Sequence, residues 1–233
     1  MITLRPAEER GVTDLGWLDS RHTFSFGEYY DPSHAGFGPL RVINEDRVRP
    51  AAGFATHGHQ DMEIISWVLE GALEHKDSIG TGSVIRPGEA QIMSAGTGIR
   101  HSEFNHSRSE PLHFLQIWIL PGRRGLAPRY DQRSFPDSER RGRLRLIGSA
   151  GGRANSIVIH QNVEVYDTLL RTGDTVRHPL ASDRRSWIQV VRGNIDVNNR
   201  PAAAGDGVAI EGEPMLTITS QRDGTEVLLF DLP

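Results

Sequence analysis

Short segments rich in β-branched and aromatic residues recur along the whole chain, and each closes at Gly, Pro, Asn or Asp. Such runs predict short strands separated by tight turns. No segment keeps a helical period for more than two turns, apart from a stretch around Pro136 to Arg141. The sequence therefore predicts an all-β fold, either a sandwich or a barrel. The predicted strands are RVINEDRV (41–48), EIISWVLEG (63–71), SVIRP (83–87), HFLQIWIL (113–120), SIVIH (156–160), VEVYDTLLR (163–171), SWIQVVRG (186–193), MLTITS (215–220) and EVLLFDL (226–232).

A weak internal repetition indicates two domains. The hairpin-and-turn pattern of residues 53–120 recurs in residues 173–231. Two similar β-barrels in tandem would produce this repetition, and the polar, Arg-rich and Gly-rich stretch of about 125–153 would connect them. A chain of 233 residues is long enough to bury a core in each. The expected domains are residues 1–132 and residues 133–233.

Charge and cysteine content exclude several classes of protein. The 26 Lys and Arg against 30 Asp and Glu give a formal net charge of -4, so no overall positive field exists to hold nucleic acid or an anionic membrane. Cysteine is absent, which excludes disulfides, thiolate metal sites and cysteine nucleophiles. No stretch approaches the roughly 18 apolar residues of a membrane span, and the N-terminus lacks the pattern of a secretion signal. We expect a soluble cytoplasmic protein.

Two pairs of residues carry the strongest chemical signal. Six of the ten histidines lie within residues 57–113. In HGHQDME, His57 and His59 are two residues apart, and in HSEFN the same spacing separates His101 from Glu103. Residues two apart on a strand point to one face, so two such strands lining a small barrel would bring four ligand atoms to one point. A single H-x-H is more often a surface or packing pair, but the second pair makes a metal site the better interpretation.

The sequence therefore predicts one bound divalent transition metal ion. Imidazoles plus a carboxylate, with positions left open for water or substrate, form the ligand set associated with Fe(II) in oxygen chemistry. Zinc, nickel, copper, manganese and cobalt are alternatives, because ligand type narrows the choice of metal without deciding it. We expect Fe(II). The predicted ligands are His57, His59, His101 and Glu103.

The remaining histidines and one further glutamate have weaker assignments. Glu63 lies four residues after His59 and could also reach the ion, although Glu103 is the preferred carboxylate. His75 follows a Gly turn and is expected to point outward from its strand. Two further pairs are expected to take no part in the site: His106 and His113, which have the wrong strand parity, and His160 and His178, which lie in the second half of the chain without an H-x-H partner.

Longer strings around these residues resemble a known family. The stretch GFATHGHQDMEIISWVLEG (53–71) is similar to the first cupin motif, and GIRHSEFN (98–105) is similar to the second. The strings LEGALEHKDS, VIRPGE and MSAGTGIRHSEFN, together with HTFSFGEYYDPSHAGFGPLRVINEDRV (22–48), resemble the pirin family, particularly its bacterial quercetinase-type members. The resemblance is strong over roughly residues 15–120 and weak over the rest.

This resemblance implies a fold and a set of ligands. It implies two cupin domains, which are jelly-roll β-barrels, in tandem, and a C-terminal domain that has lost its metal ligands. In pirins the ligands are the two histidines of H-x-H and the His and Glu of H-S-E, which favours Glu103 over Glu63 here. Glu63 is left as an acid that lies near the ion or faces the substrate.

The resemblance also implies an activity, that of a quercetin 2,3-dioxygenase, which opens the central ring of a flavonol with O2 and releases carbon monoxide. On this hypothesis the metal lowers the pKa of the flavonol 3-hydroxyl, and one of two catalytic residues, Glu103 or Glu63, accepts the proton. We expect a monomer acting on a flavonol-type substrate. Aromatic side chains that could line the pocket of a planar ligand are Phe24, Phe26, Tyr29, Tyr30, Phe37, Phe54 and Trp67.

The alternative is a non-enzymatic pirin that regulates a protein partner, with its metal serving as a redox or structural centre. The two hypotheses differ in the access that they require to the ion. An open pocket leading to the ion would favour catalysis. A closed site beside a charged patch would favour the binding of a partner.

Overall fold

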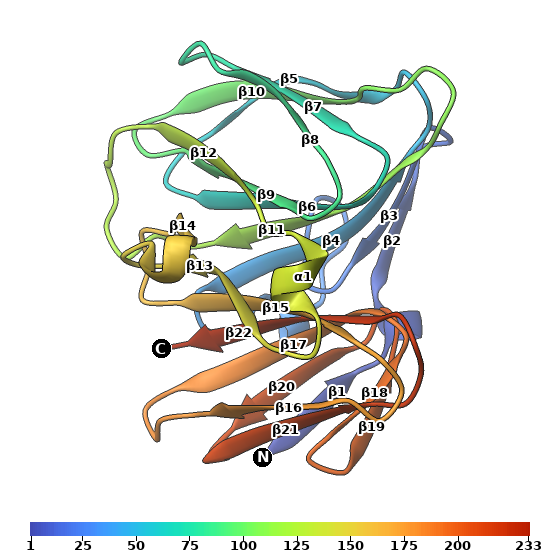
Figure 1. The fold of residues 1–233 in the computed structure, drawn as a ribbon. Helices are drawn as coiled ribbons and strands as arrows, with labels where there is room; N and C mark the ends of the chain where they lie inside the picture. The colour runs from blue at the N-terminus through green and yellow to red at the C-terminus, as the bar shows by residue number, and fades with distance from the viewer. The chain divides into compact units, whose positions relative to one another are not determined.

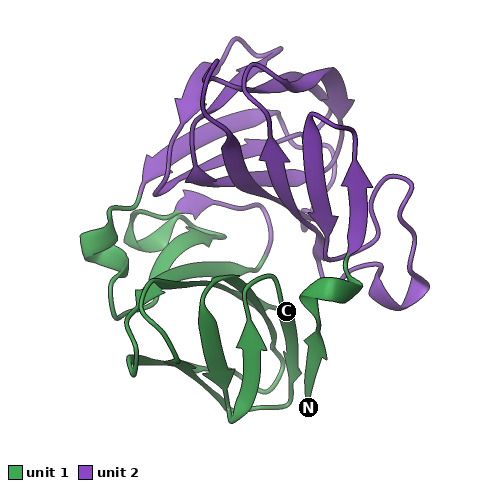
Figure 2. Ribbon diagram, turned by 90° about the vertical axis from the view of Figure 1, so that its right-hand side faces the viewer, with its two compact units in different colours: residues 1–10, 135–156, 162–233 green, residues 11–134, 157–161 purple.

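The computed structural model describes residues 1–233 and consists almost wholly of β-strands, so the predicted all-β fold is confirmed. The chain divides into two compact units, which Figure 2 colours separately. Unit 1 comprises residues 1–10, 135–156 and 162–233, and unit 2 comprises residues 11–134 and 157–161.

Unit 2 contains two antiparallel sheets, whose strands are labelled in Figure 1. Its elements are β2 (Gly11–Asp14), β3 (Leu18–His22), η2 (Pro32–His34), β4 (Leu40–Val48), β5 (Gly53–His59), β6 (Glu63–Glu70), β7 (Leu73–Asp77), β8 (Gly82–Ile85), β9 (Glu89–Ser94), β10 (Ile99–Asn105), β11 (Leu112–Ile119), β12 (Arg129–Ser134) and β14 (Ile157–Val158). The larger sheet has the strand order β12-β9-β6-β11-β4-β3-β2, and the smaller one has the order β5-β10-β7-β8.

Unit 1 is built in the same way. Its elements are β1 (Ile2–Arg5), η1 (Ala7–Glu9), α1 (Asp137–Arg140), β13 (Arg145–Ser149), η3 (Arg153–Asn155), β15 (Glu164–Leu170), β16 (Thr175–Pro179), β17 (Arg185–Arg192), β18 (Asn194–Val197), β19 (Arg200–Ala203), β20 (Gly207–Glu211), β21 (Met215–Ser220) and β22 (Thr225–Leu232). The larger sheet contains the order β1-β20-β17-β22-β15-β13, and the smaller one has the order β16-β21-β18-β19. Helix α1 lies within the stretch from Pro136 to Arg141, the one place where the sequence shows a possible helical period.

The predicted strands correspond to β4, β6, β8, β11, β14, β15, β17, β21 and β22. Among the strands that the sequence does not predict is β12, because RYDQRS carries too few β-branched residues to be recognised as a strand. It acquires its strand conformation by pairing with β9. No helix of the chain combines the length and the apolar character needed to span a membrane.

The interior of unit 2 is partly apolar and partly polar. Strand β10 alternates strictly, and its four inward positions are occupied by Ile99, His101, Glu103 and Asn105, all buried. Burying an imidazole or a carboxylate is unfavourable unless each finds a partner. The burial of His101, Glu103 and Asn105 therefore indicates that these side chains have a function besides packing. The apolar part of the interior is formed by two clusters, Leu18, Val48, Val68, Leu73, Ile85, Leu112 and Phe114 in one and Ile64, Met93, Ala95 and Ile99 in the other.

Two local features determine how β5 reaches this interior. Gly53 begins the strand at a point where a Cβ atom would collide with the carbonyl oxygen of Glu103, so only glycine permits the close approach to β10. The pairing of β5 with β10 also shifts register between His101 and Glu103. Beyond the strand, Asp61 has a φ of 48°, which ends the extended conformation before β6 begins.

Candidate metal centre

Three imidazoles converge inside unit 2. His57 and His59 come from β5, and His101 comes from β10, directly opposite His57 in the antiparallel register. The Nε2 atom of His101 lies 3.0 Å from Nε2 of His57 and 3.0 Å from Nε2 of His59. The possible ligand atoms of all three residues lie within 4.8 Å of one another. We call these residues the histidine triad.

The geometry of the triad fits a transition metal ion. Imidazole nitrogens bound at about 2.1 Å, at right angles to one another, are roughly 3.0 Å apart. The Nδ1 atom of His57 lies 2.9 Å from the carbonyl oxygen of Ala55, so that Nδ1–H donates to it and Nε2 keeps its lone pair. Burial, together with neighbouring histidines, lowers the pKa of His59 to about 4 and the pKa of His101 to about 2. Both rings are therefore neutral at neutral pH, as a metal ligand must be.

His75 lies beside the triad, and the prediction that it points outward was wrong. Its side chain is fully buried, and it stands opposite Glu103 in the register of β7 and β10. Its Nε2–H donates to Oδ2 of Asp77 at 3.0 Å, and its Nδ1 lies 3.5 Å from Nδ1 of His101. The outward assignment rested on the Gly turn before His75 and failed because a turn does not show which face of the next strand is inside, whereas the pairing with β10 does.

Glu103 is buried at the next inward position of β10. Its possible ligand atoms group with those of His75 and His101, again within 4.8 Å. The carboxylate accepts hydrogen bonds from Nε2 of Gln116 at 2.8 Å and from Oγ of Ser66 at 3.2 Å. Burial raises the pKa of Glu103 to about 7, although these hydrogen bonds oppose the rise. A carboxyl group with a pKa near 7, held by fixed donors, is suited to proton transfer at neutral pH.

Glu63 is not brought to the triad. Its Oε2 atom accepts hydrogen bonds from Oγ of Ser94 and from the backbone N–H of His160, each at 3.0 Å. The parity argument that gave Glu63 the same face as His57 and His59 requires one continuous strand. The positive φ of Asp61 interrupts that strand, so parity does not carry over into β6.

Three other histidines lie outside these groups and form hydrogen bonds with carboxylates instead. Nδ1 of His106 lies 3.0 Å from Glu74, Nε2 of His113 lies 2.9 Å from Glu45, and Nε2 of His178, in unit 1, lies 2.8 Å from Asp231. The expected structural role of His106 and His113 agrees with these contacts. Such contacts hold strands together, and none of the three residues groups with the triad.

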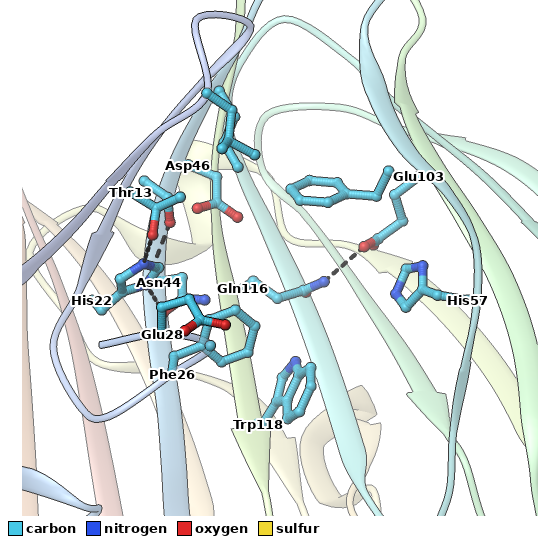
Figure 3. A pocket seen from close by; sticks show the side chains of 15 residues that line it. Thr13, His22, Phe26, Glu28, Asn44, Asp46, His57, Glu103, Gln116 and Trp118 are labelled. Atoms are coloured by element: carbon cyan, nitrogen blue, oxygen red, sulfur yellow. Dashed lines mark hydrogen bonds between the residues drawn. The ribbon is translucent and has the colours of Figure 1, made fainter. Parts of the chain in front are cut away.

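A pocket of ≈ 360 Å³ adjoins the site and is lined by His57 and Glu103 on one side (Figure 3). Figure 3 shows Gln116 near the centre of the pocket, with its amide directed at Glu103. Apolar side chains make up much of the remaining wall, namely Leu15, Leu18, Phe26, Phe54 and Trp118.

Only two of the aromatic residues expected to line a pocket, Phe26 and Phe54, do so. Phe24 and Trp67 are buried in the core, and Tyr30 is exposed. Sequence reasoning missed Trp118, which lines the pocket with its ring edge-on to His59 at a centroid distance of 4.9 Å. Its position in HFLQIWIL, two residues from Gln116, places both side chains on one face of β11.

Comparison with known sequences decides the family. The sequence model of the pirin family matches residues 4–119, and that of the quercetinase C-terminal cupin domain matches residues 146–232. The chain is 50% identical over 233 residues to quercetin 2,3-dioxygenase of Escherichia coli K12, an alignment that covers 100% of this chain and 99% of that protein. The chain belongs to the pirin family. The predicted pair of cupin domains is thereby confirmed.

Solved structures support the same assignment. The crystal structure of the bacterial pirin YhhW from Escherichia coli in complex with nickel(II) matches this pirin with a TM-score of 0.95 at 51% identity, covering 100% of this chain and 99% of that one. A putative quercetin 2,3-dioxygenase of Pseudomonas aeruginosa is 42% identical over 234 residues, with 100% of each chain covered. The triad of the present pirin thus lies in a fold that binds a transition metal in a relative.

Proposed function

We propose that this pirin is a quercetin 2,3-dioxygenase, which cleaves the central ring of a flavonol with O2 and releases carbon monoxide. The observation that carries the proposal is the convergence of three imidazoles beside a largely apolar pocket that also contains a buried carboxyl group. One divalent transition metal ion, with Fe(II) as our first choice, would be held there. The proposed ligands remain His57, His59, His101 and Glu103.

The bound ion supplies Lewis acidity, which lowers the pKa of a hydroxyl group placed beside it. Glu103 accepts the proton of the flavonol 3-hydroxyl. In the metal-free protein, burial raises the pKa of Glu103 to about 7, so burial favours the uptake of a proton by this carboxylate. Gln116 and Ser66 hold the carboxylate by their hydrogen bonds and so act as positioning residues. Glu63 has no proton-transfer role in this proposal, because it neither lines the pocket nor groups with the triad.

The apolar part of the pocket binds the flat rings and excludes water. Phe26 packs edge-on against Trp118 at a centroid distance of 5.4 Å, and Phe54 packs edge-on against Trp17 at 5.2 Å. These contacts hold the aromatic walls in fixed orientations. The pocket volume of ≈ 360 Å³ lies within the usual range of small-molecule sites, which is about 300 to 1,000 Å³.

The same pocket favours catalysis over a purely regulatory role. A redox centre that acts on a protein partner needs no route by which a small molecule reaches the ion. Here the pocket leads to His57 and Glu103, so a ligand in it would contact the proposed reaction centre directly. The proposed substrates are a flavonol and O2, and we propose that the chain acts as a monomer.

The proposal is tested by reconstituting the metal-free protein anaerobically with Fe(II) and, in separate samples, with nickel, copper, manganese, cobalt or zinc. Quercetin is then added in air, while the loss of flavonol absorbance and the release of carbon monoxide are followed. We expect both signals with at least one metal and neither with the metal-free protein. Absence of turnover with every metal would refute the dioxygenase assignment.

A further inference from the structure

The pocket has a second polar wall, which the proposed reaction does not use. Strands β3 and β4 pair so that Ser20 lies opposite Asp46 and His22 lies opposite Asn44. All four side chains are polar and line the pocket. Such a group is unusual, because neighbouring positions on the inner face of a sheet are mostly apolar. Figure 3 shows Asp46 and Glu103 reaching into the pocket from different sides.

Most polar atoms of this wall have partners within the wall. His22 donates from Nδ1 to Oδ1 of Asn44 at 2.8 Å, and Oγ1 of Thr13 lies 2.8 Å from Nε2 of His22 and donates to it. Both ring nitrogens of His22 are therefore engaged. The wall thus offers no imidazole nitrogen to a second metal ion.

Asp46 is the exception. Only 4% of its surface is exposed, and its Oδ1 atom has no hydrogen-bond partner, while Ser20 bonds to the carboxyl group. A buried carboxyl oxygen without a donor is unfavourable, so a donor supplied by a bound ligand would be favoured at this point. Burial also raises the pKa of Asp46 to about 7, so the group exchanges readily between its acceptor and its donor form.

We propose that Asp46 is a specificity-determining residue, whose free Oδ1 accepts a hydrogen bond from a phenolic hydroxyl of the substrate away from the reacting 3-hydroxyl. The inference rests on the proposed function, and it names the substrate class more closely. The pocket selects flavonols with further hydroxyl groups, because Glu103 and the triad act on the reacting hydroxyl while Asp46 binds another. A flavonol that lacks the second hydroxyl leaves the Asp46 oxygen unpaired and binds less tightly.

The test compares two ligands and three variants of the metal-loaded, full-length protein. Quercetin carries hydroxyl groups besides the reacting one, and 3-hydroxyflavone carries the reacting one alone. The variants are Asp46→Ala, the isosteric Asp46→Asn, and the control Glu45→Gln. Glu45 neighbours Asp46 on β4 but contacts Arg47 and His113 instead of lining the pocket. The dissociation constant of each flavonol is measured without oxygen, and KM and kcat are measured in air.

We expect Asp46→Ala to weaken quercetin binding and raise its KM by about tenfold, with kcat and the affinity for 3-hydroxyflavone within about twofold of wild type. Asp46→Asn should act in the same direction by a smaller factor, which preserves the test if the alanine variant does not fold. Glu45→Gln should change neither ligand's affinity. An equal effect of Asp46→Ala on both flavonols, or no effect on either, would overturn the inference.

These measurements also separate the inference from the proposed function. A wild-type protein that binds both flavonols but turns over neither refutes the dioxygenase assignment alone, and the ratio of dissociation constants still decides the role of Asp46. A wild-type protein that turns over both ligands, with a ratio unchanged in Asp46→Ala, refutes the inference alone. A protein that binds neither flavonol refutes both.

Discussion

The Nδ1 atom of His75 lies 3.5 Å from the Nδ1 atom of His101. Since Nε2–H of His75 donates to Asp77, Nδ1 of His75 carries a lone pair and accepts a hydrogen bond from Nδ1–H of His101. That tautomer leaves Nε2 of His101 free, and Nε2 is the atom that faces His57 and His59. A chain from Asp77 through His75 therefore orients the central imidazole of the triad.

Replacing His75 should weaken metal binding without removing a proposed ligand. His75→Phe keeps a flat ring but loses the hydrogen bond to His101, so we expect metal affinity to fall by about 10- to 100-fold. The measurement is a competition titration against a chelator. The matched control is His106→Phe, because His106 is an exposed histidine at the end of the same strand pair. Equal affinities in His75→Phe and wild type would show that the chain from Asp77 does not orient His101.

Glu103 and Glu63 should respond differently to the same substitution. Glu103→Gln removes the proton acceptor and one proposed ligand, so we expect kcat to fall by about 100-fold or more. Glu63→Gln alters a carboxylate that is bonded to Ser94 and His160, so kcat and metal content should stay near wild type while thermal stability falls. Steady-state kinetics and metal analysis of the two variants provide the comparison. A larger loss of kcat in Glu63→Gln would reverse the roles assigned to the two acids.

Asp46 should make the metal-free protein less stable as the pH rises. The pKa of Asp46 is raised from 3.8 to about 7, so the unfolded chain loses this proton near pH 4 and the folded chain near pH 7. Stability is therefore lost between these values, by roughly 4 kcal/mol at most at about 1.4 kcal/mol per pKa unit. The Asp46→Asn variant should not show this loss of stability, because an asparagine side chain does not titrate. Urea unfolding at about pH 4.5, just above the pKa of the unfolded chain, and at about pH 8, roughly one unit above the pKa of the folded chain, should show the variant gaining stability relative to wild type as the pH rises; a constant difference would contradict the raised pKa.

Metal addition should raise the melting temperature of the metal-free protein. An ion that binds only the folded state stabilises it by about 2.7 kcal/mol at 100 times its dissociation constant. His101→Ala removes the nitrogen shared by both short contacts of the triad, so the same addition should produce no shift in this variant. Differential scanning calorimetry measures both proteins. A full shift in His101→Ala would mean that the ion binds elsewhere.

Much of the site follows from sequence spacing. The H-x-H and H-x-E patterns place two side chains each on one face of β5 and β10, and the structure brings His57, His59 and His101 together. Spacing failed for Glu63, because parity ends where Asp61 leaves the extended conformation. The outward assignment of His75, made from the Gly turn before it, failed as well, since only the pairing of strands shows which face is buried.

The polar wall of the pocket could be recognised only in part. Gln116 interrupts the largely apolar strand HFLQIWIL, and a polar residue at an inward position of such a strand is a signal of function. Asp46 gives no such signal, because RVINEDRV also contains Asn44, Glu45 and Arg47. The partners of Gln116 cannot be read from the sequence. Ser66 and Glu103 reach Gln116 from separate strands, and this contact depends on the packing of two sheets.

The most direct test of the central claim is a titration of the metal-free protein with Fe(II), in which carbon monoxide released from quercetin is measured against metal bound per chain. We predict that the rate rises linearly and levels off at about one ion per chain, since one triad holds one ion. His101→Ala should release no carbon monoxide at any metal concentration. Full activity in the metal-free protein, or in His101→Ala, would contradict the assignment of the reaction to this site.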